Sequence, residues 1–225
     1  TKATNAKLIF TNGKQAEIEV VHNLGANGKL TTIYSIYSSG QIMVSNELKR
    51  GIIRLSELPK FGLKMQLPKE YDQLKWLGRG PFENYQDRKT AAFVDLYEST
   101  VAEQYVPYIR PQENANKTDV QWLSLTNKTG FGLKVSALEK PFSMSALHYL
   151  TEDFQSEVRA LGGQNEQNRH TIDVKERDLV ALEIDCVQQG LGGDDSWWQK
   201  PHKEYRLRKR VYTYSFLLEP VLGKK

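Results

Sequence analysis

Apolar and polar residues alternate along several stretches of this chain. A period of two is typical of a β-strand that packs one face against a core and turns the other toward water. The alternation is clearest at residues 15–20, 180–186 and 211–216. Runs rich in β-branched and aromatic residues predict further strands at 30–37, 41–48, 60–66, 120–126, 132–138 and 201–207.

One of the alternating segments gives a definite prediction of register. Val180, Leu182 and Ile184 should face the core, while Glu183 and Asp185 should lie on the opposite, wet face. A slip of one residue would exchange the two faces. Burial of Glu183 together with exposure of Leu182 would therefore disprove this register.

Turn signals separate the predicted strands at short intervals. Asn12-Gly13 fits a two-residue hairpin turn in which both residues need positive φ. Residues 151–161 carry a capping threonine and stop before a Gly-Gly pair, which favours a short helix. Many strands without a β-α-β rhythm predict an all-β antiparallel sandwich, with residues 1–225 forming a single domain.

Composition narrows the choice of partners. The 225 residues have a formal net charge of +4, and the basic residues are spread along the chain, which argues against a nucleic-acid partner. No apolar run approaches the ~20 residues of a membrane-spanning helix. The single cysteine, Cys186, lies in an apolar run and is predicted to be a buried, inert thiol. With no signal peptide and no initiator methionine, Thr1 is interpreted as a fragment boundary, and the compartment stays open between cytoplasm and periplasm.

The segment 190–197, Gly-Leu-Gly-Gly-Asp-Asp-Ser-Trp, is the strongest candidate for a binding site. The flat apolar face of a tryptophan suits the C–H face of a sugar, and its N–H can serve a hydroxyl. We therefore predict that Trp197 binds substrate, against the alternative of a core residue. For Asp194 and Asp195 a role in shaping the loop is favoured, with Asp195 kept as a candidate substrate-binding residue. Trp198 is open between the rim of the site and packing.

Three segments carry a resemblance to a known family: Trp-Leu-Gly-Arg-Gly-Pro-Phe-Glu-Asn-Tyr-Gln-Asp-Arg at 76–88, Tyr-Val-Pro-Tyr-Ile-Arg-Pro-Gln-Glu-Asn at 105–114, and residues 190–197 followed by Pro-His-Lys-Glu-Tyr at 201–205. In this order they resemble the C-terminal domain of the large β-galactosidases of glycoside hydrolase family two. The resemblance implies a super-sandwich similar to galactose mutarotase. It also implies that the domain packs beside a catalytic TIM barrel of the same or another chain, where Trp197 would stack against a galactoside. No cofactor is implied for this chain, and Mg²⁺ and Na⁺ are candidate ions of the complete enzyme.

The chain also departs from the family pattern. The residue after the motif tryptophan is usually small in the family but is Trp198 here, and the family's Glu-Asn-Gly is Glu-Asn-Ala, ending at Ala115. The opening Arg-Ala-Pro-x-Asp-Asn-Asp-like segment of the domain is absent. A C-terminal fragment without the first strands of the domain would have an open sheet edge, which invites association.

No catalytic residue is predicted in this chain. A retaining glycosidase needs two carboxylates about 5–5.5 Å apart, and in the resembled family both lie on the barrel, for which this chain has no β/α pattern. The isolated chain should therefore be inactive. The charges of residues 83–88 are interpreted as an ion-pair and capping network in preference to ligand contacts.

Two other functions remain open. The chain could be a stand-alone carbohydrate-binding module, or a small subunit that docks onto a separate catalytic chain. It could also be a mutarotase-like epimerase, which needs a histidine and a carboxylate around the anomeric oxygen. His148 and His170 are the candidates for that role, although a packed or surface histidine is favoured for both. None of the four histidines has metal-ligand spacing, so no metal site is predicted.

Overall fold

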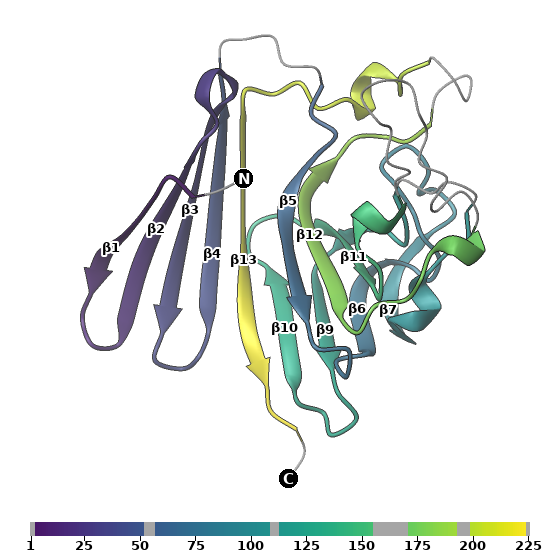
Figure 1. Cartoon of the computed structure of the whole chain (residues 1–225), viewed down its shortest axis with the longest axis horizontal. Helices are drawn as coiled ribbons and strands as arrows, with labels where there is room; N and C mark the ends of the chain where they lie inside the picture. The colour runs from purple at the N-terminus through teal and green to yellow at the C-terminus, as the bar shows by residue number, and fades with distance from the viewer. Residues whose placement is uncertain (1–2, 52–56, 109–112, 155–170, 193–198, 224–225) are drawn as a thin grey trace.

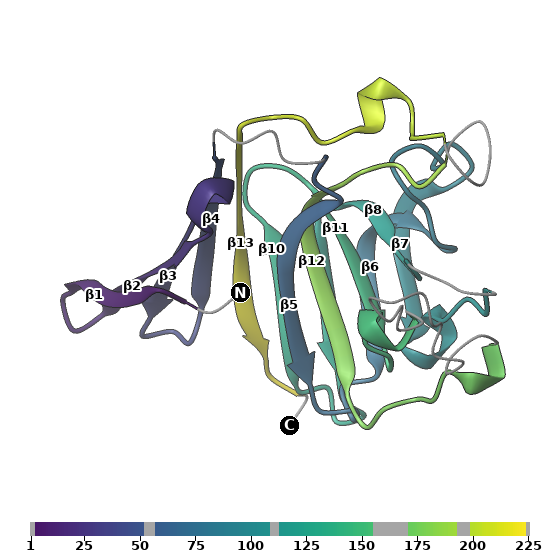
Figure 2. The same ribbon diagram turned by 45° about the horizontal axis from the view of Figure 1, so that its top comes forward.

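The protein is an antiparallel β-sandwich built from two sheets of unequal size. The computed structural model describes residues 3–51, 57–108, 113–154, 171–192 and 199–223. In these residues a nine-stranded sheet has the order β1-β2-β3-β4-β13-β10-β9-β6-β7, and a four-stranded sheet has the order β5-β12-β11-β8. The smaller sheet lies across the β13-β10-β9-β6 part of the larger one (Figures 1 and 2). The predicted fold class is confirmed.

Short turns join β1 to β2 and β3 to β4, whereas long segments separate β7 from β8, β11 from β12 and β12 from β13. The larger sheet contains β1 (Asn5–Thr11), β2 (Gln15–Asn23), β3 (Gly28–Tyr37), β4 (Ile42–Arg50), β13 (Val211–Val221), β10 (Gly132–Ala137), β9 (Trp122–Thr126), β6 (Gln73–Gly80) and β7 (Phe93–Thr100). The smaller sheet contains β5 (Lys60–Leu67), β12 (Val180–Gln188), β11 (Phe142–Leu147) and β8 (Lys117–Val120). The described helices are all 3₁₀ turns: η1 (Gly25–Asn27), η2 (Ala102–Gln104), η3 (Thr151–Phe154), η4 (Thr171–Asp173) and η5 (Lys203–Tyr205).

One expectation about local structure is wrong, and another is tested only in part. Residues 201–207 form no strand: η5 lies within them, and their one ladder contact is an isolated bridge from Leu207 to Leu58. The reason is that residues 202–204 are exposed and only Leu207 reaches the core, so no face of the segment is covered. Of the helix expected at 151–161, the described part is η3, and the rest lies outside the described residues.

The β1–β2 hairpin forms where the Asn-Gly pair predicts it, but with a different turn. The loop has three residues, 12–14, and positive φ occurs at Gly13 alone, at 80°. The side chain of Asn12 accepts hydrogen bonds from the backbone N–H groups of Lys14 and Gln15 at 3.0 and 2.9 Å. An asparagine that caps the turn in this way has no need of the left-handed region.

The core lies between the two sheets, and the register predicted for β12 is correct. Val180, Leu182 and Ile184 are fully buried and pack in one apolar cluster with residues of β6, β9 and β13. The opposite face of β12 is not wet, however, because Glu183 and Asp185 are also buried, at 7% and 4% exposure. Alternation therefore gave the correct side for each residue but missed the polar layer that covers the outer side.

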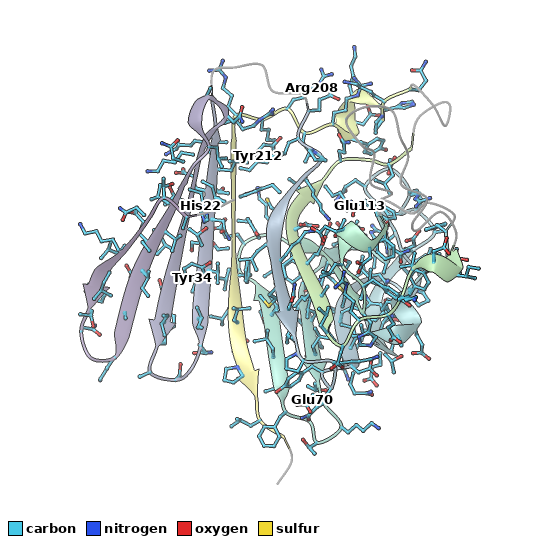
Figure 3. The ribbon with its side chains drawn as sticks, in the orientation of Figure 1. His22, Tyr34, Glu70, Glu113, Arg208 and Tyr212 are labelled. Atoms are coloured by element: carbon cyan, nitrogen blue, oxygen red, sulfur yellow. The ribbon has the colours of Figure 1, made fainter. Side chains whose placement is uncertain are left out.

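The larger sheet extends well beyond the smaller one. Residues paired across β1, β2, β3, β4 and β13 share one face, in the row Leu8, Ile18, Tyr34, Val44 and Phe216. Val44 and Phe216 are fully buried in the core cluster, whereas Leu8 is 56% exposed. Figure 3 shows Tyr34 and His22 on the part of the sheet that lies beyond β5. The apolar inner face thus continues past the edge of its cover.

Candidate functional site

The first family-like segment leaves β6 in a turn that is tied to β8. The side chain of Asn84 is fully buried, and its Oδ1 accepts from the backbone N–H of Thr118 at 2.9 Å and from the Thr118 hydroxyl at 2.6 Å. The amide of Asn116 donates to the backbone oxygen of Asn84 at 2.7 Å. Because both strands belong to the sandwich, this turn has a rigid base.

Glu83 connects the first segment to the second. Its carboxylate accepts hydrogen bonds from the backbone N–H of Ala115 at 3.0 Å, from the hydroxyl of Tyr85 at 3.1 Å and from that of Tyr108. Arg88 completes the set with an ion pair at 3.2 Å. Every described polar contact of Glu83 is therefore internal, in agreement with the structural interpretation of the charges at 83–88.

The third segment contacts the same turn. The backbone N–H of Gly192 donates to Oδ2 of Asp87 at 2.6 Å, and the N–H of Gly190 donates to the backbone oxygen of Tyr205 at 3.0 Å. The three family-like segments, which are far apart in the sequence, thus meet through Glu83 and Asp87. In the sequence Asp87 is only one of several charges at 83–88, and no signal pairs it with the glycine loop.

A buried charge cluster lies on the outer face of β5 and β12. The Nζ of Lys60 pairs with Glu183, with Glu113 at 3.2 Å and with Asp185 at 3.9 Å. Lys64 pairs with the other oxygen of Glu183 at 2.8 Å. Figure 3 places Glu113 beside this sheet. The sequence contains a signal for these ion pairs: lysines alternate along β5 and carboxylates alternate along β12, so the two strands have complementary charges on one face.

The cluster separates the pKa values of its carboxyl groups. Burial opposes the charged form of Glu183, but Lys60, Lys64 and Thr151 together outweigh burial and lower the pKa to about 2. For Asp185, burial dominates over the attraction of Lys60 and raises the pKa to about 7. Lys60 is itself desolvated, yet the surrounding carboxylates hold its pKa above the usual value.

A pair of carboxyl groups with divergent pKa values is one mark of acid–base catalysis, but the geometry here is structural. The cavity lined by Glu113 and Glu183 has a volume of about 10 Å³, which is the space of a single water. Asp185 lies against the backbone of β5, where a Cβ on Gly62 would come within 1.8 Å of its Oδ1. No sugar ring fits between Glu113 and Glu183, and the wider pocket of about 410 Å³ that Glu183 borders has neither Glu113 nor Asp185 in its lining.

The residues predicted to bind substrate, Trp197, Asp195 and Trp198, lie outside the described residues, as does Asp194. The described part of their loop is its start, Gly190–Gly192, which lies against Asp87. The site assignment therefore stays a prediction.

His148 is a packed residue. It is 2% exposed; its Nδ1 lies 2.7 Å from the backbone oxygen of Leu179 and its Nε2 lies 3.1 Å from Oδ1 of Asp72. It borders a cavity of about 590 Å³ together with Asp72 and Glu176, but both ring nitrogens are engaged. An epimerase base needs a nitrogen directed at its substrate, so this geometry does not favour that role. His170 lies outside the described residues.

Other candidate chemistry is limited. Cys186 is partly buried, and burial raises the pKa of its thiol to about 11, which keeps it protonated and unreactive at neutral pH. Across the described ranges, no group of three or more His, Cys, Asp or Glu side chains could hold a metal ion. Within the same ranges, no helix has the length and apolar character needed to cross a membrane.

Comparison with known sequences decides the family. Residues 2–218 match the family described as β-galactosidase small chain. This chain belongs to that family. It is 36% identical over 189 residues to a β-galactosidase of Priestia megaterium (strain DSM 319 / IMG 1521), covering 84% of this chain and 17% of the relative. It is 32% identical over 216 residues to a β-galactosidase of Pseudoalteromonas haloplanktis, and this alignment covers 92% of this chain and 19% of the relative. The chain spans less than a fifth of the length of these relatives.

A solved structure supports the fold. Galactose 1-epimerase from Lactobacillus acidophilus NCFM aligns over 98% of this chain and 67% of its own, with a TM-score of 0.50 and 8% identity. At this identity the likeness concerns the fold alone. The super-sandwich similar to galactose mutarotase, expected from the resemblance, is therefore confirmed.

Proposed function

We propose that this chain is a domain of a family-two β-galactosidase and that it completes the galactoside site beside a catalytic TIM barrel. The observation that carries the proposal is the family match over residues 2–218, which takes in all three family-like segments. The relatives it matches are β-galactosidases of which the aligned region is 17% and 19%. Hydrolysis of terminal β-D-galactosides would then belong to the complete enzyme.

Within that enzyme, the role proposed for this chain is to bind sugar rather than to cleave it. Trp197 would cover one face of the galactoside, with Asp195 and Trp198 beside it. Support comes from the loop that leads to them: Gly190 and Gly192 lie against the turn of Asp87, which is anchored to the sandwich. The carboxylates of Glu113, Glu183 and Asp185 form ion pairs with Lys60, so we do not propose any two of them as a catalytic pair.

A further part of the proposal concerns the uncovered sheet. The inner face of β1–β3 is apolar and continuous with the core, and Leu8, which lies on this face of β1, is 56% exposed. We infer that residues 1–225 are one sandwich whose cover over β1–β3 is supplied by other strands of the complete protein. An exposed apolar area of this kind is typical of a surface that packs against a partner.

Whether the barrel lies on the same polypeptide or on a second chain follows from the length of the natural gene. The name of the family, a small chain, favours a separate subunit, whereas the long relatives favour one polypeptide. A stand-alone binding module is the remaining alternative, and a gene without any catalytic partner would favour it.

The test is hydrolysis of nitrophenyl β-galactoside by the purified chain alone, with a complete β-galactosidase as the positive control. We expect no turnover above background from the isolated chain, because the catalytic carboxylate pair belongs to the barrel. Turnover that survives re-purification and disappears in Glu183→Gln or Asp185→Asn would show that this chain carries its own catalytic pair.

A further inference from the structure

A cavity of about 590 Å³ lies at the end of the sandwich where β6 and β12 begin. Gln73, the first residue of β6, lines this cavity, and so does Glu176, shortly before β12. The three family-like segments meet beyond the other ends of these two strands. Because the eight residues of β6 span about 25 Å, the cavity is separate from that meeting point. Figure 3 shows Glu70, another lining residue, at the foot of the sandwich and Arg208, which follows η5, at its top.

Hydrogen bonds hold the walls of this cavity in place. In the turn between β9 and β10, the Oδ1 of Asn127 accepts from the N–H of Thr129 at 3.0 Å and from its hydroxyl at 2.7 Å. The backbone oxygen of Asp72 accepts from the N–H of Val101 at 2.9 Å, and the buried ring of His148 lies 3.1 Å from Oδ1 of the same aspartate. Because these residues follow or precede strands of both sheets, the cavity is preformed, as ligand pockets usually are.

The charged side chains around the rim are of both signs. Lys69 pairs with Glu176 at 3.4 Å. Glu70 and Lys128 are exposed and have no ion-pair partner among the described residues. An anionic or a cationic ligand would therefore meet repulsion as well as attraction at this rim. The charge pattern favours an uncharged ligand.

Several hydrogen-bonding groups that line the cavity are unused. Among the described residues, the side-chain amide of Gln73, the Nδ2 of Asn127 and the Oδ2 of Asp72 have no hydrogen-bond partner. Lys128 adds donors alone, and the carboxylate of Glu70 adds acceptors alone. A hydroxyl group donates and accepts at once, so a ligand that carries several hydroxyls can use this mixture of groups.

We propose that this cavity binds an uncharged sugar through its hydroxyl groups. The methyl group of Ala102 and the aliphatic stem of Lys69 supply apolar surface for the ring. The described lining includes no aromatic side chain, so the binding should be weak, with a Kd on the order of 1 mM for a monosaccharide. The inference goes beyond the proposed function, because it uses neither Trp197 nor a catalytic barrel.

The experiment is a titration of the purified 225-residue chain with D-galactose, followed by saturation-transfer difference NMR of the sugar. We expect a saturable signal in the wild-type chain. Ala102→Phe puts a ring into the cavity from an exposed position and should abolish the signal. Glu70→Ala removes a charged acceptor and should raise the Kd about tenfold. Glu139→Ala is the matched control, since this exposed glutamate follows the far end of β10 and does not line the cavity; it should leave the Kd unchanged.

Trp197→Ala separates this inference from the proposed function. The galactose signal should persist in that variant with an unchanged Kd. Loss of the signal there would assign the binding to the tryptophan segment, which would overturn the inference about the cavity while supporting the sugar contact proposed for Trp197.

Other results would also overturn the inference. One is the absence of a saturable signal from the wild-type chain at about 10 mM galactose, tenfold above the expected Kd. Another is a signal that persists unchanged in both Ala102→Phe and Glu70→Ala, with thermal melts showing that the variants fold. Free glutamine, which carries an ammonium and a carboxylate, is the control ligand. Binding of glutamine without binding of galactose would show that the rim recognises charge rather than hydroxyl groups.

Discussion

At Ala115 the backbone adopts a conformation that most residues avoid. Its φ is 62°, it is 1% exposed, and its N–H donates to Glu83. The resembled family has glycine here, and the positive φ gives the physical reason. The sequence showed the substitution but could not show which backbone angle was involved.

This conformation predicts an uneven response to substitution. Ala115→Gly should change the free energy of unfolding by less than about 0.5 kcal/mol, because relief of strain offsets the lost methyl packing. Ala115→Val should destabilise by about 2–3 kcal/mol, since a β-branched residue is poorly accommodated at positive φ in a packed site. Urea unfolding measures both. Ala137→Val, at a strand position in β10, is the control and should be close to neutral.

The raised pKa of Asp185 leads us to predict that the stability of the fold depends on pH. Its pKa is raised to about 7 by burial, so the folded state retains a proton that the unfolded chain releases near pH 4. The stability that this group contributes is therefore present at low pH and is lost as the pH rises from about 4 to about 7. Replacing Asp185 with asparagine removes this loss. The melting temperature of Asp185→Asn relative to wild type should rise between pH 5 and pH 8, by the equivalent of about 2 kcal/mol. A difference that stays constant or falls would contradict the shift.

Strand β12 shows what the alternation of apolar and polar residues can predict and what it cannot. The pattern assigned Leu182 and Ile184 to the core correctly because transfer of apolar side chains from water dominates the choice of face. It could not show that the outer face is also covered, since that depends on Lys60 of β5 and on Glu113 of a distant loop. The segment 201–207 has strand-like residues, but its one described ladder contact is the isolated bridge between Leu207 and Leu58, so it forms no strand.

The two lysines of β5 provide a matched test of the buried cluster. Lys60→Ala would leave Glu113, Glu183 and Asp185 without their shared cation and should destabilise by about 3 kcal/mol. Lys64 pairs with the same Glu183, but its side chain is 50% exposed, so Lys64→Ala should cost less than about 1 kcal/mol. Equal effects in urea unfolding would mean that burial does not govern this network.

For the whole molecule, the pairing of thirteen described strands into sheets of nine and four was not predictable from periodicity. Alternation fixes a face, but strand order depends on long-range contacts, and the family resemblance supplied the super-sandwich. That the three family-like segments meet in space was not predicted from the sequence. Glu83 and Asp87, which join them, were missed as individual contacts.

The uncovered face predicts how the isolated chain behaves. With Leu8 56% exposed on an edge strand, the purified chain should associate as its concentration rises. Leu8→Lys should reduce this association in sedimentation velocity experiments. Ile172→Lys replaces an 85% exposed apolar residue of η4, away from this face, and should leave it unchanged. A monomeric wild-type chain at high concentration would argue against a missing cover.

The central claim is that this chain supplies a sugar-binding tryptophan to a β-galactosidase, and steady-state kinetics of Trp197→Ala and Trp197→Phe in the complete enzyme test it most directly. Loss of an aromatic ring that stacks on the ligand should remove about 1–3 kcal/mol of binding, by analogy with aromatic stacking on bases. We expect kcat/KM for Trp197→Ala to fall about ten- to a hundredfold with the melting temperature unchanged, and Trp197→Phe to lose less. Unchanged kinetics in both variants, or a fall in melting temperature that accounts for the lost activity, would contradict the claim.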